Sequence, residues 1–248
     1  MTVLFVSAAP GARPVVEARH PAVRTWIHRI AASAVEIRDA TGPGLSASQI
    51  AFVPVDAPRV VFDLRAGSST TATCLGTSHP AISCAARELE TLARSLGDAL
   101  PPMRRQFREG AQRYRQALLW LRSRILSELG NNDLTGLRLA AIGPDLQPLL
   151  ADLGLAALRS YTDVDAVLAD HGGGESAEAL FYPEDLPLQQ RSQLRDAGGL
   201  AFPYRRLAPS AGLEDYDRAT GFNLKQVLEA VRMVGEARRA SPSRRAER

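Results

Sequence analysis

The chain has very few of several residue types. Lys225 is the only lysine, so arginine supplies nearly all of the positive charge, and only two cysteines and four histidines are present. Aromatic residues make up 6% of the 248 residues. The core must therefore be built mainly from leucine, alanine, valine and isoleucine, and a chain of this length can bury a sizeable one.

Several functional motifs are also missing. No apolar run approaches the roughly 20 residues that a membrane-spanning helix needs. The chain contains no Gly-x-Ser-x-Gly, His-Glu-x-x-His or paired-carboxylate motif, so hydrolytic chemistry has no support. The run Gly172–Gly174 follows a short predicted helix, and no Lys-Ser/Thr pair follows it, unlike a phosphate-binding loop. We therefore expect a binding protein and not an enzyme.

The net charge is +3, and the basic excess is concentrated at the C-terminus. Five arginines lie there beside one acid, Glu247: Arg238, Arg239, Arg244, Arg245 and Arg248. A short Arg-, Ser- and Pro-containing end is typical of a solvated, disordered tail. We find no folded basic face in the sequence to accompany it, so we expect no nucleic-acid partner.

Periodicity predicts alternating strands and helices in the first part of the chain. Strands are expected at Val15–Ala18, Val35–Arg38 and Val60–Leu64, a helix opened by Pro21, and a short helix over Ser46–Phe52. This β-α-β-α-β order favours a parallel sheet covered by helices.

Two long helices and a second alternation follow. The helices are expected at 83–100 and 103–129, the second spanning roughly 40 Å at about 1.5 Å per residue. The remaining elements are strands at 137–142, 156–161, 177–182 and 199–203, and helices at 146–153, 164–170, 187–197 and 216–237. The expected fold is α/β, with two small parallel-sheet lobes bridged by one long helix.

This reading divides the chain into five segments. Residues 1–14 are either the remnant of a signal peptide or an ordinary first strand, because they are apolar but lack a positive start. The other segments are an N-terminal lobe at 15–101, a bridging helix at 102–130, a C-terminal lobe at 131–236 and a disordered tail at 237–248.

The order of these elements resembles the solute-binding proteins of zinc and manganese ABC importers, a chelatase-like fold. The run Gly-Thr-Ser-His79-Pro before a helix, the strand ending at Gly143 with the helix after it, and Leu180-Phe-Tyr-Pro183 all resemble that family's pattern. Tyr216, Asn223 and Leu224 match the spacing of its closing helix. The resemblance covers roughly residues 15–235.

The resemblance implies four metal ligands, of which this chain keeps one. The second ligand corresponds to His79, whereas the first falls in the loop at Thr41, the third on Gly143 and the fourth on Pro203. Tightly held Zn²⁺ needs about four N, S or O donors at roughly 2.0–2.3 Å. A metal is therefore bound differently here, or it is not bound.

His79 lies midway between the two cysteines, as Cys74-x4-His79-x4-Cys84. Three readings stay open. The three side chains together would suit copper or zinc, the two cysteines could form a disulfide in an exported protein, or both could be free thiols.

Four more residues are candidates for the site. Asp145 is either a hard oxygen ligand or a cap of the helix that follows it. Tyr182, Tyr204 and Arg205 stand at the C-terminal ends of predicted strands, the edge that faces the ligand in open α/β sheets. An aromatic and arginine-lined cleft would suit an anionic or chelated ligand, whereas the alternative is a surface arginine.

The leading expectation is the solute-binding component of a metal-type ABC importer, periplasmic or otherwise exported and monomeric. It would bind a metal ion (zinc, manganese or copper) or a metal complex in the interlobe cleft and deliver it to a membrane permease. The alternative is an accessory or interaction protein, such as a metallochaperone or regulator, that has lost the metal site. A chelatase-type enzyme would have only His79 as a general acid or base.

Overall fold

The computed structural model describes residues 13–31, 34–40, 45–46, 49–53, 60–63, 80–155, 157–170, 177–197, 199–208 and 210–240. The chain forms two compact units. The first unit comprises Met1–Leu119 and Leu207–Tyr216, and the second comprises Trp120–Arg206 and Asp217–Arg248. None of the described helices is long and apolar enough to cross a membrane.

The first unit contains a four-stranded sheet in the order β2-β1-β3-β4. Its elements are β1 (Val15–Ala18), α1 (Pro21–Ala31), β2 (Glu36–Asp39), β3 (Gln49–Val53) and β4 (Val60–Asp63). Strand β1 pairs with β2 in parallel, whereas β3 runs antiparallel to both β1 and β4. The expected parallel sheet is therefore wrong for this unit, because β3 is antiparallel to both of its neighbours and, among the described strands, β1 and β2 form the one parallel pair.

The helix predicted over Ser46–Phe52 is also wrong, because its residues 49–52 belong to strand β3. Consecutive residues Ile50 and Ala51 are both buried, as expected of a strand with neighbours on both sides and cover on both faces. In a short apolar run of this kind, the spacing of the apolar residues does not distinguish a strand from a helix. Pairing with the neighbouring strands β1 and β4 therefore decides its conformation.

Helix α1 is buried around most of its surface and carries the buried arginine Arg24. The Arg24 guanidinium lies 2.7 Å from an Asp39 carboxylate oxygen and donates to the carbonyl of Ala211 at 3.1 Å. Asp39 ends β2 and Ala211 belongs to the segment Leu207–Tyr216. This buried cation therefore connects two distant parts of the chain within the first unit.

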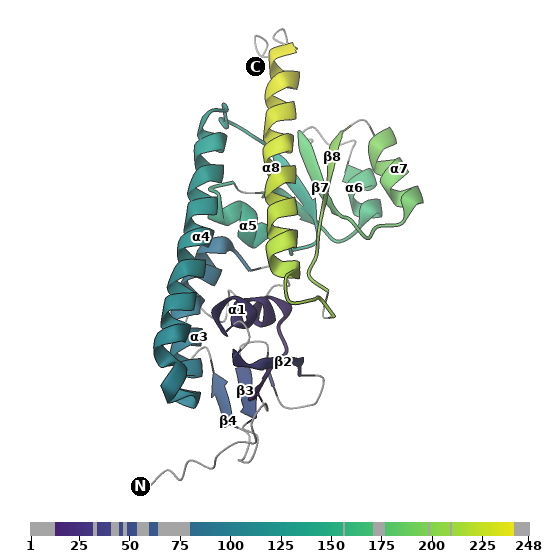
Figure 1. Ribbon diagram of the computed structural model, residues 1–248. Coiled ribbons are helices and arrows are strands. Elements are labelled where there is room, and N and C mark those ends of the chain that lie inside the picture. The colour runs from purple at the N-terminus through teal and green to yellow at the C-terminus, as the bar shows by residue number, and fades with distance from the viewer. Residues whose placement is uncertain are drawn as a thin grey trace. The chain divides into compact units, whose positions relative to one another are not determined.

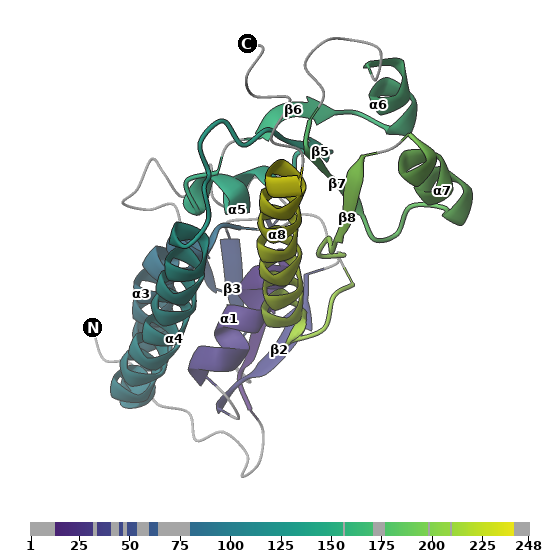
Figure 2. The same cartoon turned by 90° about the horizontal axis from the view of Figure 1, so that it is seen from above.

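Helix α3 (Ile82–Ala99), a 3-10 turn at Pro101–Met103 and helix α4 (Arg104–Gly130) follow. Helices α3 and α4 lie side by side in Figures 1 and 2. Gly110 of α4 is required by close packing, since a Cβ there would lie 2.5 Å from the carbonyl oxygen of Ile30. The long helix was predicted within a residue of its ends, and it contributes residues to both units.

The second unit contains a parallel sheet in the order β6-β5-β7-β8. Its elements are β5 (Leu139–Ile142), α5 (Gln147–Asp152), β6 (Ala157–Tyr161), α6 (Val164–Asp170), β7 (Ala179–Pro183), α7 (Leu188–Asp196), β8 (Leu200–Tyr204) and α8 (Asp215–Ala240). Every predicted element of this half is present, which confirms the α/β prediction and the parallel sheet here.

Both faces of this sheet are covered. In Figure 1, α8 lies on one side of β7 and β8, and α6 and α7 lie on the other. Alternate residues of β5 and β7 pack against α6 and α7 in one cluster: Ala140, Ile142, Leu180 and Tyr182 with Val164, Val167 and Leu194. The other alternate residues, such as Ala141 and Phe181, are equally buried on the opposite face. Cover on both faces explains why these strands read as continuous apolar runs.

The C-terminus departs from the prediction of a disordered tail from residue 237. Helix α8 continues to Ala240, and Arg238 is bound by Glu178 of the same unit. The ion pair with this partly buried carboxylate favours an ordered conformation of Arg238. Residues 241–248, like residues 1–12, lie outside the described part of the chain.

Candidate functional site

The topology of the second sheet defines where a site is expected. The chain moves from β5 outward to β6 on one side, and from β7 outward to β8 on the other. In open parallel sheets a ligand binds at the carboxyl ends of the strands where this direction reverses, here between β5 and β7. The residues that follow β5, β7 and β8 at this edge are therefore the candidates.

Gly143 follows β5 with φ +83°, and its N–H donates to the carbonyl of Tyr161 at 2.8 Å. A Cβ at Gly143 would lie 3.2 Å from the Arg206 Nη2 and 3.2 Å from the Tyr204 hydroxyl. A residue with a side chain would be strained and crowded at this position. The strand therefore ends in a glycine at the point where the resemblance implies a metal-binding imidazole.

Four residues form what we call the Arg206 cluster: Gly143, Asp145, Tyr204 and Arg206. The Nε of Arg206 lies 3.1 Å from an Asp145 carboxylate oxygen, and its guanidinium lies 6.0 Å from the Tyr204 ring centre. The Tyr204 hydroxyl donates to the carbonyl of Ile142 at 2.7 Å. The ends of β5 and β8, up to 63 positions apart in sequence, are thus joined around one guanidinium.

The electrostatics of the cluster keep its charges fixed. Burial raises the pKa of the Tyr204 phenol, so it stays a neutral donor. Partial burial disfavours the Arg206 cation, but the hydrogen bond with Tyr204 and the charge of Asp145 outweigh this and raise its pKa. A permanent cation therefore stands beside the implied metal-ligand position, paired with Asp145 and close enough to Asp185 to interact with its charge.

Arg205 serves a different purpose from the neighbouring Arg206. Its guanidinium holds both carboxylate oxygens of Glu184, at 2.7 and 3.0 Å, and lies 4.6 Å from the ring centre of Phe222. The Asn223 side chain accepts from the Arg205 N–H at 2.7 Å and donates to its carbonyl at 3.0 Å. These contacts fix the end of β8 to α8, and the hydrogen bond from Arg205 lowers the pKa of Glu184.

The two tyrosine candidates are both buried. Tyr182 is 4% exposed within the cluster against α6 and α7, and Tyr204 is 1% exposed. Their rings pack in the core, and the Tyr204 hydroxyl donates a hydrogen bond to a backbone carbonyl. The assignment of these two tyrosines to a ligand cleft stays a prediction, as does that of Arg205. The packing contacts described here do not support it.

Asp145 does not cap helix α5, whose N-cap is Leu146 without a side-chain cap bond. Its carboxylate faces Arg206 instead. The sequence identifies Asp145 as a candidate, but it carries no signal for the pairing of Asp145 with Arg206.

His79 and Cys74 lie outside the described residues. Cys84, at the start of α3, is 3% exposed and disulfide-bonded, so in this state it offers no thiolate to a metal. The described residue next to His79 is Pro80, whose carbonyl accepts from the Tyr216 hydroxyl at 3.2 Å. Tyr216 in turn packs edge-on against Trp26, with ring centres 5.8 Å apart.

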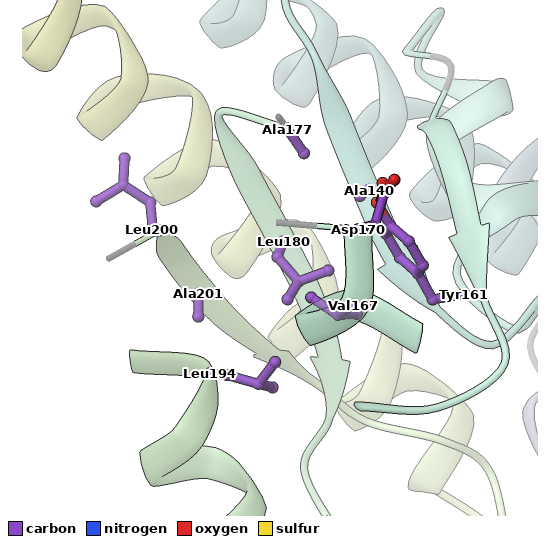
Figure 3. Close-up of a pocket in the computed structure, with 10 residues that line it drawn as sticks. Ala140, Tyr161, Val167, Asp170, Ala177, Leu180, Leu194, Leu200 and Ala201 are labelled. Carbon is purple, nitrogen blue, oxygen red and sulfur yellow. Dashed lines mark hydrogen bonds between the residues drawn. The ribbon is translucent and has the colours of Figure 1, made fainter. Parts of the chain in front are cut away.

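Among the described residues no group of three or more His, Cys, Asp or Glu side chains is placed to hold a metal ion. The second unit contains a small pocket, shown in Figure 3, with Tyr161 and Asp170 at one side and apolar side chains such as Leu180 and Val167 around it. The Tyr161 hydroxyl donates to Asp170 at 2.6 Å. With about 20 Å³ of space, this pocket has room for about one water molecule and not for a solute.

The fold described above is that of the substrate-binding proteins of metal-type ABC importers. The chain is similar to the substrate-binding protein FpvC of Pseudomonas aeruginosa in complex with Mn²⁺, at 16% identity over 90% of this chain and 100% of that one, with a TM-score of 0.65. It is also similar to the periplasmic zinc-binding protein TroA of Treponema pallidum, at 15% identity over 89% and 99%, with a TM-score of 0.58.

A third similar structure is the laminin-binding protein Lbp of Streptococcus pyogenes, at 11% identity over 88% of this chain and 98% of that one, with a TM-score of 0.59. No family model and no curated protein matches the sequence. The likeness therefore lies in the fold, and it extends over nearly the full length of each compared chain.

Proposed function

We propose that this protein is the solute-binding component of an ABC importer and that its cargo is a metal complex with anionic groups. The observation that carries the proposal is the likeness of fold over 88–90% of this chain to substrate-binding proteins solved with metal ions. An exported location is part of the proposal. The disulfide at Cys84 supports it, because disulfides persist in oxidising compartments.

The Arg206 cluster supports a complex over a bare ion. Arg206 is 40% exposed and is oriented by Asp145 and Tyr204, so part of its guanidinium remains accessible. Guanidinium groups bind carboxylate-type oxygens with two parallel hydrogen bonds. A chelated metal presents such oxygens, so the cation here would bind the chelating groups while the metal stays within its complex.

Binding and delivery, not catalysis, is the proposed activity, and the partner is a membrane permease. His79 is the metal-ligand position that the resemblance retains, and its contribution to cargo binding stays a prediction. Zinc, manganese and copper also remain predictions, as does a monomeric state.

Calorimetric titration of the oxidised protein tests this proposal. The probes are Zn²⁺, Mn²⁺ and ferric citrate, and the variants are Arg206→Gln, His79→Ala and, as a control, Arg124→Gln. The exposed Arg124 side chain pairs with Glu128 and lies over the Trp120 ring, both on α4. We expect ferric citrate to bind to the unchanged protein. Its affinity for Arg206→Gln should be about tenfold lower, because a charged hydrogen bond to the ligand is lost. The control should bind as the unchanged protein does.

The possible outcomes separate the two parts of the proposal. Stoichiometric binding of bare Zn²⁺ that Arg206→Gln leaves unchanged would refute the anionic complex and keep the binding-protein role. Absence of binding by all three probes would count against this cargo class altogether.

A second candidate is an accessory or interaction protein on the same scaffold. It is favoured by the likeness to Lbp and to the laminin-binding adhesin Lmb of Streptococcus agalactiae, both named for binding a protein. This candidate is also consistent with the described part of the chain, in which no group of three or more His, Cys, Asp or Glu side chains is placed to hold a metal ion. The same titration discriminates, since this candidate requires no cargo binding and no effect of Arg206→Gln.

A further inference from the structure

The first unit has a groove on the exposed side of helices α3 and α4. It encloses about 540 Å³ and is lined by nine residues of these two helices, four of which are arginines. The two helices run side by side, as Figures 1 and 2 show from two directions. A volume in this range is typical of sites for small organic ligands.

Small residues form the base of the groove. Ala93 of α3 and Ala111 of α4 are 5% and 3% exposed, whereas the residues beside them on the walls are long and exposed. Alanine at the contact between two helices lets the backbones approach, and long side chains on both sides then rise above a shallow floor. The groove therefore follows from the pattern of alanines and arginines on the two facing helix surfaces.

Ion pairs close both ends of the groove. Asp98 accepts from Arg104 at 2.9 Å near the turn between the helices, and Glu90 lies 3.2 Å from Arg115 further along. Both pairs connect α3 with α4. At each end, the charge of the arginine is therefore balanced by a carboxylate of the other helix.

Two arginines lie between these ends, Arg94 on α3 and Arg108 on α4. The helices are antiparallel, so residue 94, between 90 and 98, faces the level of residue 108, between 104 and 115. Within the described residues neither guanidinium has an ion pair or a hydrogen-bond partner. The centre of the groove therefore carries two unpaired positive charges, one from each wall.

We propose that this groove binds a phosphate group between Arg94 and Arg108. Each guanidinium can donate two parallel hydrogen bonds to phosphate oxygens, so a phosphate between the walls can be bound from both sides. The phosphate has two sources that share these oxygens. One is a soluble phosphate or phosphate monoester, which carries up to two negative charges, and the other is the phosphodiester headgroup of an anionic phospholipid, which carries one.

This site is independent of the proposed importer function. It lies within the first unit and uses no residue of the Arg206 cluster, so the two proposals can fail separately.

The test is calorimetric titration with inorganic phosphate at fixed ionic strength, with acetate as the reference anion. The variants are Arg94→Gln, Arg108→Gln and the double variant, and the matched control is Arg113→Gln, an exposed arginine on α4 that does not line the groove. Co-sedimentation with phosphatidylglycerol vesicles, against phosphatidylcholine vesicles, forms the second arm. Circular dichroism confirms that each variant remains helical.

We expect each groove variant to bind phosphate or phosphatidylglycerol vesicles about tenfold more weakly, because a charged hydrogen-bonding group has been removed, and the control to stay within about twofold. Groove-dependent binding of phosphate without vesicle binding assigns a soluble source, and groove-dependent sedimentation with phosphatidylglycerol assigns a lipid. Absence of binding in both arms overturns the proposal. Equal weakening by Arg113→Gln also overturns it, because binding would then reflect diffuse charge.

Discussion

The contacts of Arg238 explain why the chain stays helical beyond residue 237, where the sequence predicts a disordered tail. It donates to both Glu178 carboxylate oxygens, at 2.8 and 2.6 Å, and to the carbonyls of Thr135 and Gly136, each at 2.9 Å. Composition alone assigned this arginine to a disordered tail. The carboxylate and the two carbonyls that bind it lie 60 to 103 positions earlier in the sequence, so no local pattern could reveal them.

Replacing Glu178 by Gln should destabilise the second unit by about 2 kcal/mol at pH 7, because charged hydrogen bonds to a partly buried carboxylate are lost. Urea unfolding measures this change. Glu229→Gln, on an exposed surface of α8, is the control and should have little effect. An equal effect of the two substitutions would contradict the structural role of Glu178.

The same pair predicts a pH dependence. Burial by itself would raise the pKa of Glu178, but hydrogen bonds from Arg238 and from the Arg138 N–H, with their charges, outweigh it and lower the pKa. A lowered folded-state pKa stabilises the protein above the unfolded value of about 4.3, and this contribution is lost as the pH falls through the folded pKa. The stability difference between the parent protein and Glu178→Gln should be constant from about pH 6 to 8 and shrink below about pH 4.

At the scale of elements, two glycines in helices predict opposite effects. A Cβ at Gly110 would lie 2.5 Å from a backbone oxygen of α1, whereas nothing lies within 4 Å of one at Gly221 in α8. We expect Gly110→Ala to destabilise by about 2 kcal/mol through overpacking, and Gly221→Ala to stabilise by about 0.5–1 kcal/mol through helix propensity. Thermal unfolding of both variants measures this. A neutral Gly110→Ala would mean that α1 and α4 are not in close contact.

The elements of the second sheet were predictable because each is separated from the next by a clear stop. Helix α5, for example, ends at Asp152 and is followed by Gly154 in the left-handed region, with the Leu155 N–H bonded to the carbonyl of Leu150. Strand β3 lacked such a signal. It is a short apolar segment whose partners β1 and β4 are antiparallel to it, and this pairing is not encoded locally.

At the scale of the whole molecule, the disulfide at Cys84 should contribute to stability. The two cysteines of the chain are ten positions apart, and a loop of this length is expected to contribute about 2–3 kcal/mol when closed. Adding reductant should therefore lower the melting temperature by roughly 5–10 °C. The double variant Cys74→Ser, Cys84→Ser should not respond to reductant, and a response equal to that of the parent would exclude the disulfide as the cause.

The sequence by itself determined the order of elements from residue 82 to 240 and the α/β class, because both follow from local periodicity. It also determined that Gly143 departs from a metal-ligand pattern, because that depends on the identity of a single residue. Only the tertiary structure decided that Arg206 and Asp145 meet beside Gly143 and that Arg94 and Arg108 face each other across a groove. The physical reason is that both arrangements depend on the pairing of strand ends or of helix surfaces, and such pairing is set by packing between segments distant in the chain.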